Sequence, residues 1–497
     1  MPHVRKPILL LPTVVALLAA WYTAPLACAA EPAPAPPAAV APADEPLTWI
    51  PWSDDVFARA KREHRLVLLD LEAVWCHWCH VMAETTYRDP AVVAVLREKY
   101  LLVRVDQDAH PDLANRYEDY GWPATVVFDG DGRELAKRRG YIAPLSMASM
   151  AQAFVDDPTP GPSVTDGMGA PVAAAHADGP LPAEQRAALL ETWRDGYDRA
   201  QAGWGTVHKY LDADGLELAM LRAAGDADAA GMVRATLEAA RALIDPVWGG
   251  VYQYSTGGVW SEPHFEKIME VQAGALRTYA QAYALWKRPA DLAAAQAVRK
   301  YLRDFLTGSD GAFLTSQDAD VVQGEHSAEF FALDDAGRRA RGMPRIDTHR
   351  YARENGWAIT ALVAYYGATG DATALADAER AGAWVLAHRA VPGGGFSHDG
   401  DSADGIYLGD TLAMGRAALA LYTATGSRAW LAVASGAGHF IAATFQPAEP
   451  AAGALNAGFL TAAARGQALP PLPQRDENVA LARFANLLAR HTGDAAH

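Results

Sequence analysis

The sequence contains little cysteine and is short of basic charge. Three of its 497 residues are cysteines, and 43 lysines and arginines stand against 59 aspartates and glutamates, for a formal net charge of −16. An acidic surface without a basic run repels phosphate backbones, so nucleic acid is not an expected partner. Beyond the leader, no segment is apolar enough to cross a bilayer. What remains is the composition of a globular protein that is long enough for two domains.

The leader, residues 1–30, has the pattern of a secretory signal peptide. Basic residues precede an apolar stretch over 8–20, and small residues follow at 27–29. We therefore expect cleavage and a periplasmic or secreted mature protein. Two alternatives stay open, an uncleaved membrane anchor over 8–30 and lipidation of Cys28.

Changes in composition divide the rest of the chain into four segments. Residues 31–46 are a tether rich in proline and alanine, and residues 157–182 form a linker rich in proline, glycine and alanine. Between them, residues 47–156 alternate between helical and strand patterns. Beyond the linker, residues 183–492 are apolar at the helical period of 3.6 residues.

The segment 47–156 has the element order of a thioredoxin fold. The turn Asp-Gly-Asp-Gly at 129–132 lies between two apolar runs and predicts a hairpin. The expected helices cover 53–64, 81–87, 90–99 and 144–155, and the expected strands cover 66–71, 101–106, 124–128 and 133–139.

The segment 183–492 is expected to be all helical. Loops rich in glycine and aromatic residues, such as Trp248-Gly249-Gly250, recur after helices and predict stacked helical hairpins that close into a toroid. The expected helices cover 184–199, 228–244, 267–286, 289–306, 353–369, 372–389, 409–425, 427–444 and 477–490.

The stretch Trp75-Cys76-His77-Trp78-Cys79-His80 carries nearly all of the sulfur chemistry. With Cys28 removed in the leader, Cys76 and Cys79 are the remaining pair. A strand before a C-x-x-C motif and a helix after it form the context of a redox centre. We expect Cys76, in the first turn of the helix, to attack as a thiolate and Cys79 to resolve the mixed disulfide. This prediction depends on sulfur atoms that a partner can reach.

Further residues are expected to complete the redox site. Asp70 lies on the preceding strand, where a desolvated carboxylate can pass a proton to and from the resolving thiol, unless it faces water at the strand end. Pro123 precedes the strand at 124–128, where thioredoxin folds place a cis proline against the disulfide. The tryptophans expected to contact the substrate are Trp75, Trp78 and Trp122.

Three other interpretations of the cysteine motif remain. Residues 76–80 also match C-x-x-C-H, the attachment signature of c-type haem, but a strand on one side does not suit a small helical haem pocket. A zinc site would use the two cysteines and the two histidines of the motif. A purely structural disulfide would restrain little, because the loop it closes is short. We expect no cofactor and no metal.

Motifs in both halves give the chain a resemblance to a known family. The matching motifs are Cys76-His77-Trp78-Cys79-His80-Val81-Met82, Val105-Asp106 through His110-Pro111-Asp112, Gly121-Trp122-Pro123, Pro263-His264-Phe265-Glu266-Lys267, Ser316-Gln317-Asp318-Ala319-Asp320 and Glu354-Asn355-Gly356-Trp357. In these segments the chain resembles the spermatogenesis-associated thioredoxin-domain proteins and their bacterial relatives. The resemblance implies an α/β thioredoxin-like domain joined to an all-α toroid, the (α/α)6 type of six-hairpin glycosidases. The loop Gln107-Asp108-Ala109 departs from the family pattern, because it lacks the basic and acidic residues usual after that Val-Asp.

The motifs of the second half also supply candidate sugar contacts. Paired carboxylates with a histidine in an aromatic cleft are what sugar hydrolases and epimerases use. The alternative is that these residues only cap helices and pack hairpin ends. The candidates are His264, Glu266, Gln317, Asp318 and Asp320.

Two functions follow as hypotheses. The first is an exported thiol–disulfide oxidoreductase or redox sensor, with a protein thiol or disulfide as partner and the toroid as a ligand or partner surface. The alternative is a carbohydrate-active or sugar-binding protein whose thioredoxin-like domain is structural.

Overall fold

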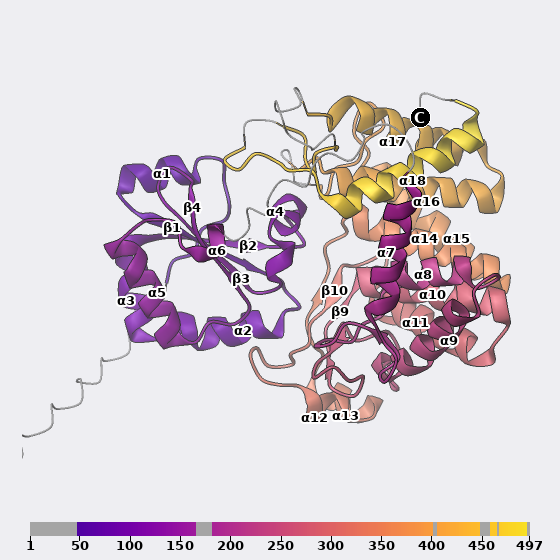
Figure 1. Ribbon diagram of the computed structural model, residues 1–497, viewed down its shortest axis with the longest axis horizontal. Helices are drawn as coiled ribbons and strands as arrows, with labels where there is room; N and C mark the ends of the chain where they lie inside the picture. Colours follow the sequence, from indigo (N-terminus) through magenta and orange to yellow (C-terminus); the bar gives the residue numbers. More distant parts are fainter. Residues whose placement is uncertain (1–46, 166–180, 401–404, 448–457, 465–466, 495–497) are drawn as a thin grey trace, which may run out of the picture. The chain divides into compact units, whose positions relative to one another are not determined.

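The computed structural model describes residues 47–165, 181–400, 405–447, 458–464 and 467–494 (Figure 1). The expected signal peptide at 1–30 and tether at 31–46 lie outside these ranges, as do residues 166–180 of the expected linker. All described residues fall within one compact unit, 42–497. Within the described ranges, no helix combines the length and the hydropathy that a membrane span requires.

The N-terminal domain is built on a four-stranded mixed sheet in the order β2-β1-β3-β4. Strand β1 pairs in parallel with β2 and antiparallel with β3, and β3 pairs antiparallel with β4. This is the thioredoxin-like fold that the sequence predicts. The elements are α1 (Val56–Glu63), β1 (Leu66–Glu72), α2 (His77–Glu84), α3 (Pro90–Lys99), β2 (Tyr100–Asp106), α4 (Pro111–Arg116), β3 (Ala124–Phe128), β4 (Glu134–Arg139), α5 (Pro144–Asp156) and α6 (Pro162–Thr165).

The central strand β1 is buried on both faces, which explains its unbroken apolar run. Leu69 and Leu71 pack in a cluster with residues of α1 and α4, whereas Leu68 packs in a second cluster with residues of α2, α3 and α5. Figure 1 shows helices on both faces of this sheet. Because successive strand residues point to opposite faces, Asp70 lies on the same face as Leu68, toward α2.

The start of α3 shows how local sequence sets an element. Asp89 is the N-cap, and its side chain accepts hydrogen bonds from the backbone amides of Ala91 and Val92. Pro90 occupies the first helical turn, where its missing N–H costs nothing. The Asp-Pro pair therefore fixes the point at which the chain becomes helical.

The second domain is a ring of antiparallel helices. Inner helices pack in sequence, α8 on α10, α10 on α14, α14 on α16 and α16 on α18, and each of α8, α10, α14 and α16 packs on the helix that follows it as a hairpin partner. Arg483 of α18 donates a hydrogen bond of 2.7 Å to Glu217 of α8, which joins the last helix to the first. This is an all-α toroid, as predicted, and its described part contains four complete hairpins.

The elements of the second domain follow in chain order. The helices are α7 (Ala183–Asp195), α8 (Ala213–Arg222), α9 (Ala227–Ala240), α10 (Met269–Trp286), α11 (Pro289–Phe305), α12 (Ala328–Phe331), α13 (Asp335–Arg341), α14 (Ala352–Thr369), α15 (Ala372–His388), α16 (Leu408–Thr425), α17 (Arg428–Thr444) and α18 (Arg475–Thr492). Short strands are β5 (Tyr197–Asp198), β6 (Gly203–Trp204), β7 (Tyr254–Ser255), β8 (Pro263–His264), β9 (Lys267–Ile268), β10 (Ser316–Gln317) and β11 (Ile346–Asp347).

The loops of the second domain are organised by a small sheet in the order β11-β10-β9. Strand β10 pairs antiparallel with both neighbours, Ser316 with Ile268 and with Asp347. The sheet holds Ile268 in place and fixes the start of the loop 318–326, which follows β10 directly. Ile268 and this loop both contact the segment of the cysteine motif.

A buried ion cluster anchors the same sheet to the core. Asp245 accepts a bidentate pair of hydrogen bonds from Arg338, at 2.7 and 3.0 Å, and a third from Lys267 at 2.7 Å. All three side chains are fully buried. Burial alone would raise the pKa of Asp245, but the charge of Lys267 and the hydrogen bonds of Arg338 and Lys267 outweigh it and lower the pKa to about 2.

Candidate functional site

The two cysteines of the motif form a disulfide at the start of α2. Cys76 is the N-cap of this helix, and its sulfur accepts a hydrogen bond of 3.2 Å from the backbone amide of Cys79. The helix begins at His77, earlier than the helical pattern from residue 81 indicates. Amides and dipole at a helix N-terminus favour a thiolate once the bond is reduced.

The disulfide is covered. Cys76 is 3 % exposed and Cys79 is 4 % exposed, in a cluster with the buried Trp75. Trp122 and Ile268 pack against this cluster, and Ile268 belongs to β9 of the second domain. The expectation of accessible sulfur atoms is therefore wrong for this conformation, because the second domain packs on the redox face.

One carboxylate of the second domain contacts both histidines of the cysteine motif. His77 Nδ1 lies 2.7 Å from Asp320 Oδ1, and His80 Nδ1 lies 3.0 Å from Asp320 Oδ2. We call these three residues the Asp320 clasp. Asp318 Oδ1 lies 3.7 Å from His80 Nδ1. The clasp joins the redox helix to the loop that follows β10.

Burial and charge shape the titration of the clasp. Burial alone would lower the pKa of His80, but the hydrogen bond with Asp320 and the charges of both aspartates outweigh it and raise the pKa. Burial raises the pKa of Asp318 to about 6. For Asp320, the hydrogen bonds with His77 and His80 outweigh burial and lower the pKa. The ionised carboxylate of Asp320 and a protonated His80 thus stabilise each other.

A second contact between the domains lies beside Trp75. Trp75 Nε1 donates a hydrogen bond of 2.8 Å to Asp108 Oδ2. His398 of the second domain places Nε2 2.6 Å from the backbone oxygen of Asp108 and Nδ1 2.9 Å from Asp410 Oδ1. Since both partners are acceptors, each nitrogen donates, and His398 is an imidazolium when both bonds are made.

The proposed proton carrier, Asp70, is buried and paired. It is 2 % exposed, and its Oδ2 accepts a hydrogen bond of 3.2 Å from Arg104 of β2. Burial raises the pKa of Asp70 despite this cation. Its position on the α2 face suits a proton carrier, and that role stays a prediction.

Sequence reasoning missed Glu72, which lies two residues further along β1 on the same face. Arg104 Nε contacts its carboxylate at 3.2 Å, and burial raises the pKa of Glu72 to about 7. The charge of His80 also acts on Glu72. A signal for Glu72 was available, because side chains of a strand point alternately to its two faces. Glu72 therefore shares the face of Asp70, toward the redox helix α2.

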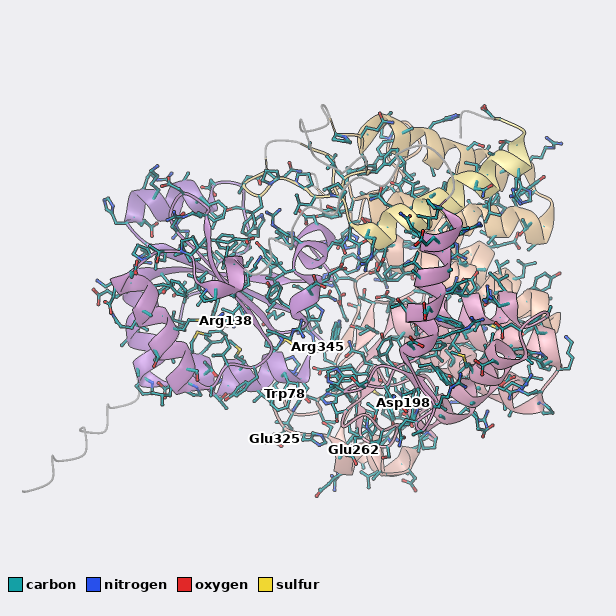
Figure 2. The ribbon with its side chains drawn as sticks, in the orientation of Figure 1. Trp78, Arg138, Asp198, Glu262, Glu325 and Arg345 are labelled. Carbon is teal, nitrogen blue, oxygen red and sulfur yellow. A yellow bond between two sulfur atoms is a disulfide. The ribbon has the colours of Figure 1, made fainter. Side chains whose placement is uncertain are left out.

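The tryptophans and the proline of the predicted site differ in exposure. Trp78, labelled in Figure 2, is 41 % exposed and is the most exposed of the three tryptophans. Trp75 is buried and Trp122 is partly buried against the disulfide cluster. The peptide bond between Trp122 and Pro123 is cis. A role of these residues in substrate contact stays a prediction.

The candidate sugar contacts are divided among different environments. Asp318 and Asp320 face the histidines of α2. Gln317 is buried, and its Oε1 accepts a hydrogen bond of 3.0 Å from the Tyr301 hydroxyl. His264 Nδ1 lies 3.8 Å from Glu266 Oε1, and Glu266 is itself 3 % exposed. A role in sugar binding stays a prediction for all of them.

Contacts between distant segments were outside the reach of sequence reasoning. Ile268, His398 and Asp410 were not identified, although each lies at or beside the redox face. Ile268 directly follows a recognised motif, which was a signal for its importance. The sequence offers no comparable signal that His398 contacts the loop of Asp108.

The fold and the site define a class, a thioredoxin-like domain with a disulfide-bonded C-x-x-C pair followed by a helical toroid. The Thioredox_DsbH family, described as "Protein of unknown function, DUF255", matches residues 37–154. Spermatogenesis-associated protein 20 of Homo sapiens is 24% identical over 310 residues, which cover 55% of this chain and 39% of that protein. The predicted resemblance is confirmed: this chain is similar to the spermatogenesis-associated thioredoxin-domain proteins.

Other similar proteins match one domain or a part of the chain. Thiol:disulfide interchange protein DsbD 2 of Pseudomonas aeruginosa is 36% identical over 89 residues, 17% of this chain and 15% of that protein. Uncharacterized protein B0495.5 of Caenorhabditis elegans is 24% identical over 318 residues, 58% of this chain and 43% of that protein. This chain thus spans about two fifths of the length of the curated relatives it matches over both domains.

Solved structures resemble the chain more loosely. A D-mannose isomerase aligns with a TM-score of 0.49 and 13% identity over 64% of this chain and 85% of that one. A cellobiose 2-epimerase from Bacillus thermoamylovorans aligns with a TM-score of 0.48 and 11% identity over 63% of this chain and 82% of that one.

Proposed function

We propose that this chain is an exported thiol–disulfide exchange protein, an oxidoreductase or a redox sensor, that uses Cys76 and Cys79. One observation carries the proposal: in a thioredoxin-like domain, the two cysteines are bonded at the N-terminus of α2. The similarity of this domain to a thiol:disulfide interchange protein supports it. Export rests on the leader pattern of residues 1–30.

The chemistry divides between the two sulfur atoms. Two electrons and two protons from a dithiol partner convert the disulfide to two thiols. In the reverse direction, the Cys76 thiolate attacks a partner disulfide and releases one partner thiol; Cys79 then attacks the Cys76 sulfur, releases the second partner thiol and restores the bond. Asp70, on the face toward α2, accepts the proton that Cys79 loses.

The covered disulfide limits which partners react. Both cysteines are nearly fully buried beneath Ile268, and the Asp320 clasp holds the second domain against the redox helix. A small thiol needs only a local fluctuation to reach sulfur, whereas a folded protein needs the second domain to move aside. Opening of the clasp therefore controls exchange with proteins.

Trapping of the mixed disulfide tests the assignment of the two sulfur atoms. Cys79→Ser lacks the resolving thiol, so after addition of an oxidised peptide it should accumulate a mixed disulfide through Cys76, visible as an added mass. Cys76→Ser, the matched control, should form far less and should lose insulin reduction. Equal trapping by the two variants, or undiminished insulin reduction by Cys76→Ser, would contradict the proposal.

The carbohydrate alternative has no support from a particular contact. Its candidate residues are divided between the contacts of α2, a buried hydrogen bond of Gln317 and the pair of His264 and Glu266. It stays a prediction, which calorimetric titration of simple sugars would test.

A further inference from the structure

Four polar side chains lie next to the disulfide and take no part in the exchange chemistry itself. Two are the histidines of the cysteine motif, His77 and His80, and two are the carboxylates of the motif 316–320, Asp318 and Asp320. The sequence places them about 240 residues apart, yet they meet where the redox helix contacts the loop after β10. Neither cysteine is involved, since both sulfur atoms are bonded to each other.

The donor atoms of three of these side chains are spaced as the ligands of one ion are. His80 Nδ1, an oxygen of Asp318 and an oxygen of Asp320 all lie within 4.8 Å of one another. His80 Nδ1 is 3.0 Å from Asp320 Oδ2 and 3.7 Å from Asp318 Oδ1. Tetrahedral zinc ligands at 2.0–2.2 Å from the metal are about 3.3–3.6 Å apart, a value that these two distances bracket.

Two carboxylates lie close together in a buried place at this point. The side chain of Asp318 is 0 % exposed and that of Asp320 is 1 % exposed. In the described part of the chain, neither aspartate forms an ion pair with a lysine or an arginine; their ion-pair partners are His77 and His80. Buried carboxylates are ordinarily paired with cations or bound to a metal.

A set of outer hydrogen bonds holds the carboxylates in position. The amide of Asp320 donates to Asp318 Oδ1 at 2.9 Å, and Gln323 Nε2 donates to Asp318 Oδ2 at 2.8 Å. The amide of Gly324, whose φ of +79° favours glycine, donates to Asp320 Oδ2 at 2.9 Å. His77 Nδ1 contacts the other oxygen of Asp320. Such outer contacts orient metal ligands and tune their affinity.

We propose that His80, Asp318 and Asp320 bind one divalent transition-metal ion of the zinc class, with His77 hydrogen-bonded to Asp320 from outside. The ion takes the place of the proton between His80 Nδ1 and Asp320, which is released to solvent, so that this nitrogen offers its lone pair. One imidazole and two carboxylates favour such an ion over calcium or magnesium, which prefer sets of oxygen ligands. The ion would join the redox helix to the second domain. The site does not depend on the thiol–disulfide function, because its ligands exclude both sulfur atoms.

The other cluster with metal-ligand spacing differs in one decisive respect. Glu354, His398 and Asp410 are also close together. There, however, His398 already uses both ring nitrogens, Nδ1 toward Asp410 and Nε2 toward the backbone oxygen of Asp108. An imidazolium bonded on both sides has no lone pair for a metal, so this second cluster carries no metal proposal.

The experiment uses the full, oxidised chain after removal of metals with a chelator. Calorimetric titration with Zn²⁺ should show one ion per chain, and Asp318→Asn and His80→Gln should each weaken binding at least tenfold. Glu325→Gln is the matched control, since it removes an exposed carboxylate from the same loop and should leave the affinity unchanged. The site would be overturned if wild type does not bind Zn²⁺. It would also be overturned if Asp318→Asn and His80→Gln bind Zn²⁺ as tightly as wild type does.

A measurement on wild type alone guards against variants that fail to fold. Co²⁺ bound to the oxidised chain should give d–d absorption bands without a sulfur-to-cobalt charge-transfer band, because nitrogen and oxygen are the ligands. Tight Co²⁺ binding that appears only after reduction, together with a thiolate band, would assign the metal to the cysteines and overturn the proposal.

Discussion

Two buried aspartates in this chain, Asp245 and Asp320, are paired with different kinds of side chain. In the core of the second domain, Asp245 is bonded by Lys267 and Arg338, and these contacts lower the pKa of its carboxyl to about 2. At the redox helix, Asp320 is bonded by the imidazoles of His77 and His80, and imidazole, unlike ammonium or guanidinium, is also a common metal ligand. Both carboxylates are almost fully buried.

The difference separates an anchor inside the second domain from a contact between the two domains. Removal of either cation from Asp245 leaves an uncompensated buried charge, so the Asp245 cluster anchors the core, although burial lowers the pKa of Lys267 to about 8. An imidazole can lose its proton and can bind a metal when it is neutral. The contacts of the Asp320 clasp can therefore change with pH or with a bound metal ion. The sheet of β9, β10 and β11 connects the two, since Lys267 and Ile268 are neighbours.

The largest effect is expected from Asp245→Asn. Lys267 and Arg338 would remain buried without an ionised partner, which should cost about 3–5 kcal/mol of unfolding free energy. Urea unfolding measures the loss. Asp131→Asn, at an ion pair that is largely exposed, is the control and should change the midpoint little. A similar midpoint shift for both variants would remove the contrast between anchor and surface pair.

Asp320→Asn is expected to lower the stability less than Asp245→Asn does. It should also make the Cys76–Cys79 disulfide clearly more accessible to protein reductants. The change weakens the contacts with His77 and His80 and should cost about 1–3 kcal/mol. In the presence of a chelator, the rate at which a protein dithiol reduces the disulfide should rise at least tenfold. Reduction by a small phosphine should change far less, since it already reaches the sulfur by local fluctuation.

The control for the clasp is Glu325→Gln, which removes an exposed charge from the same loop, where Figure 2 labels Glu325. It should leave both reduction rates unchanged. If Asp320→Asn accelerates the small reductant as much as the protein reductant, the clasp does not control access.

A modest pH dependence is expected at the second contact of the domains. Burial alone would lower the pKa of His398, but the charge and hydrogen bond of Asp410 and the charge of Glu354 outweigh it and raise the pKa, against the opposing charge of Arg353. A raised histidine pKa stabilises the fold below the unfolded value of about 6.5, and that stability is lost as pH rises through the folded pKa.

The melting temperature of wild type should therefore fall as the pH rises above about 6.5, and the fall should be shallower in His398→Gln. Asp106 acts in the same direction over a lower range, because burial raises its pKa to about 6. Asp245, with a pKa of about 2, adds no slope there. Identical slopes in wild type and His398→Gln would show that His398 does not contribute.

The sequence predicts the elements of this chain better than their contacts. The apolar run of β1, the Asp-Pro start of α3 and the helical period of α10 and α14 are local signals, and the structure has these elements close to the predicted bounds. The helices α4, α6, α8, α12 and α13 were missed, and each has ten residues or fewer. Weak periodicity in ten residues or fewer does not distinguish a helix from a loop.

At the candidate site, too, the sequence predicts local features better than contacts between distant segments. The cysteine pair was identifiable because spacing and neighbouring strand are encoded locally. The cover formed by Ile268 and the clasp formed by Asp320 depend on how the second domain packs on the first, over a separation of about 190 to 240 residues. Single-sequence patterns carry no information on such pairs, so the burial of the sulfur atoms could not be predicted.

The central claim, that Cys76 and Cys79 exchange electrons reversibly, is tested most directly by the midpoint potential of the pair. Equilibration of the full chain in glutathione or dithiothreitol buffers, followed by alkylation and mass spectrometry, counts free thiols at each potential. The account predicts a reversible two-electron transition at a potential above about −300 mV, where exchange proteins lie. A disulfide that stays oxidised below about −300 mV, with no thiol recovered until the chain unfolds, would contradict it.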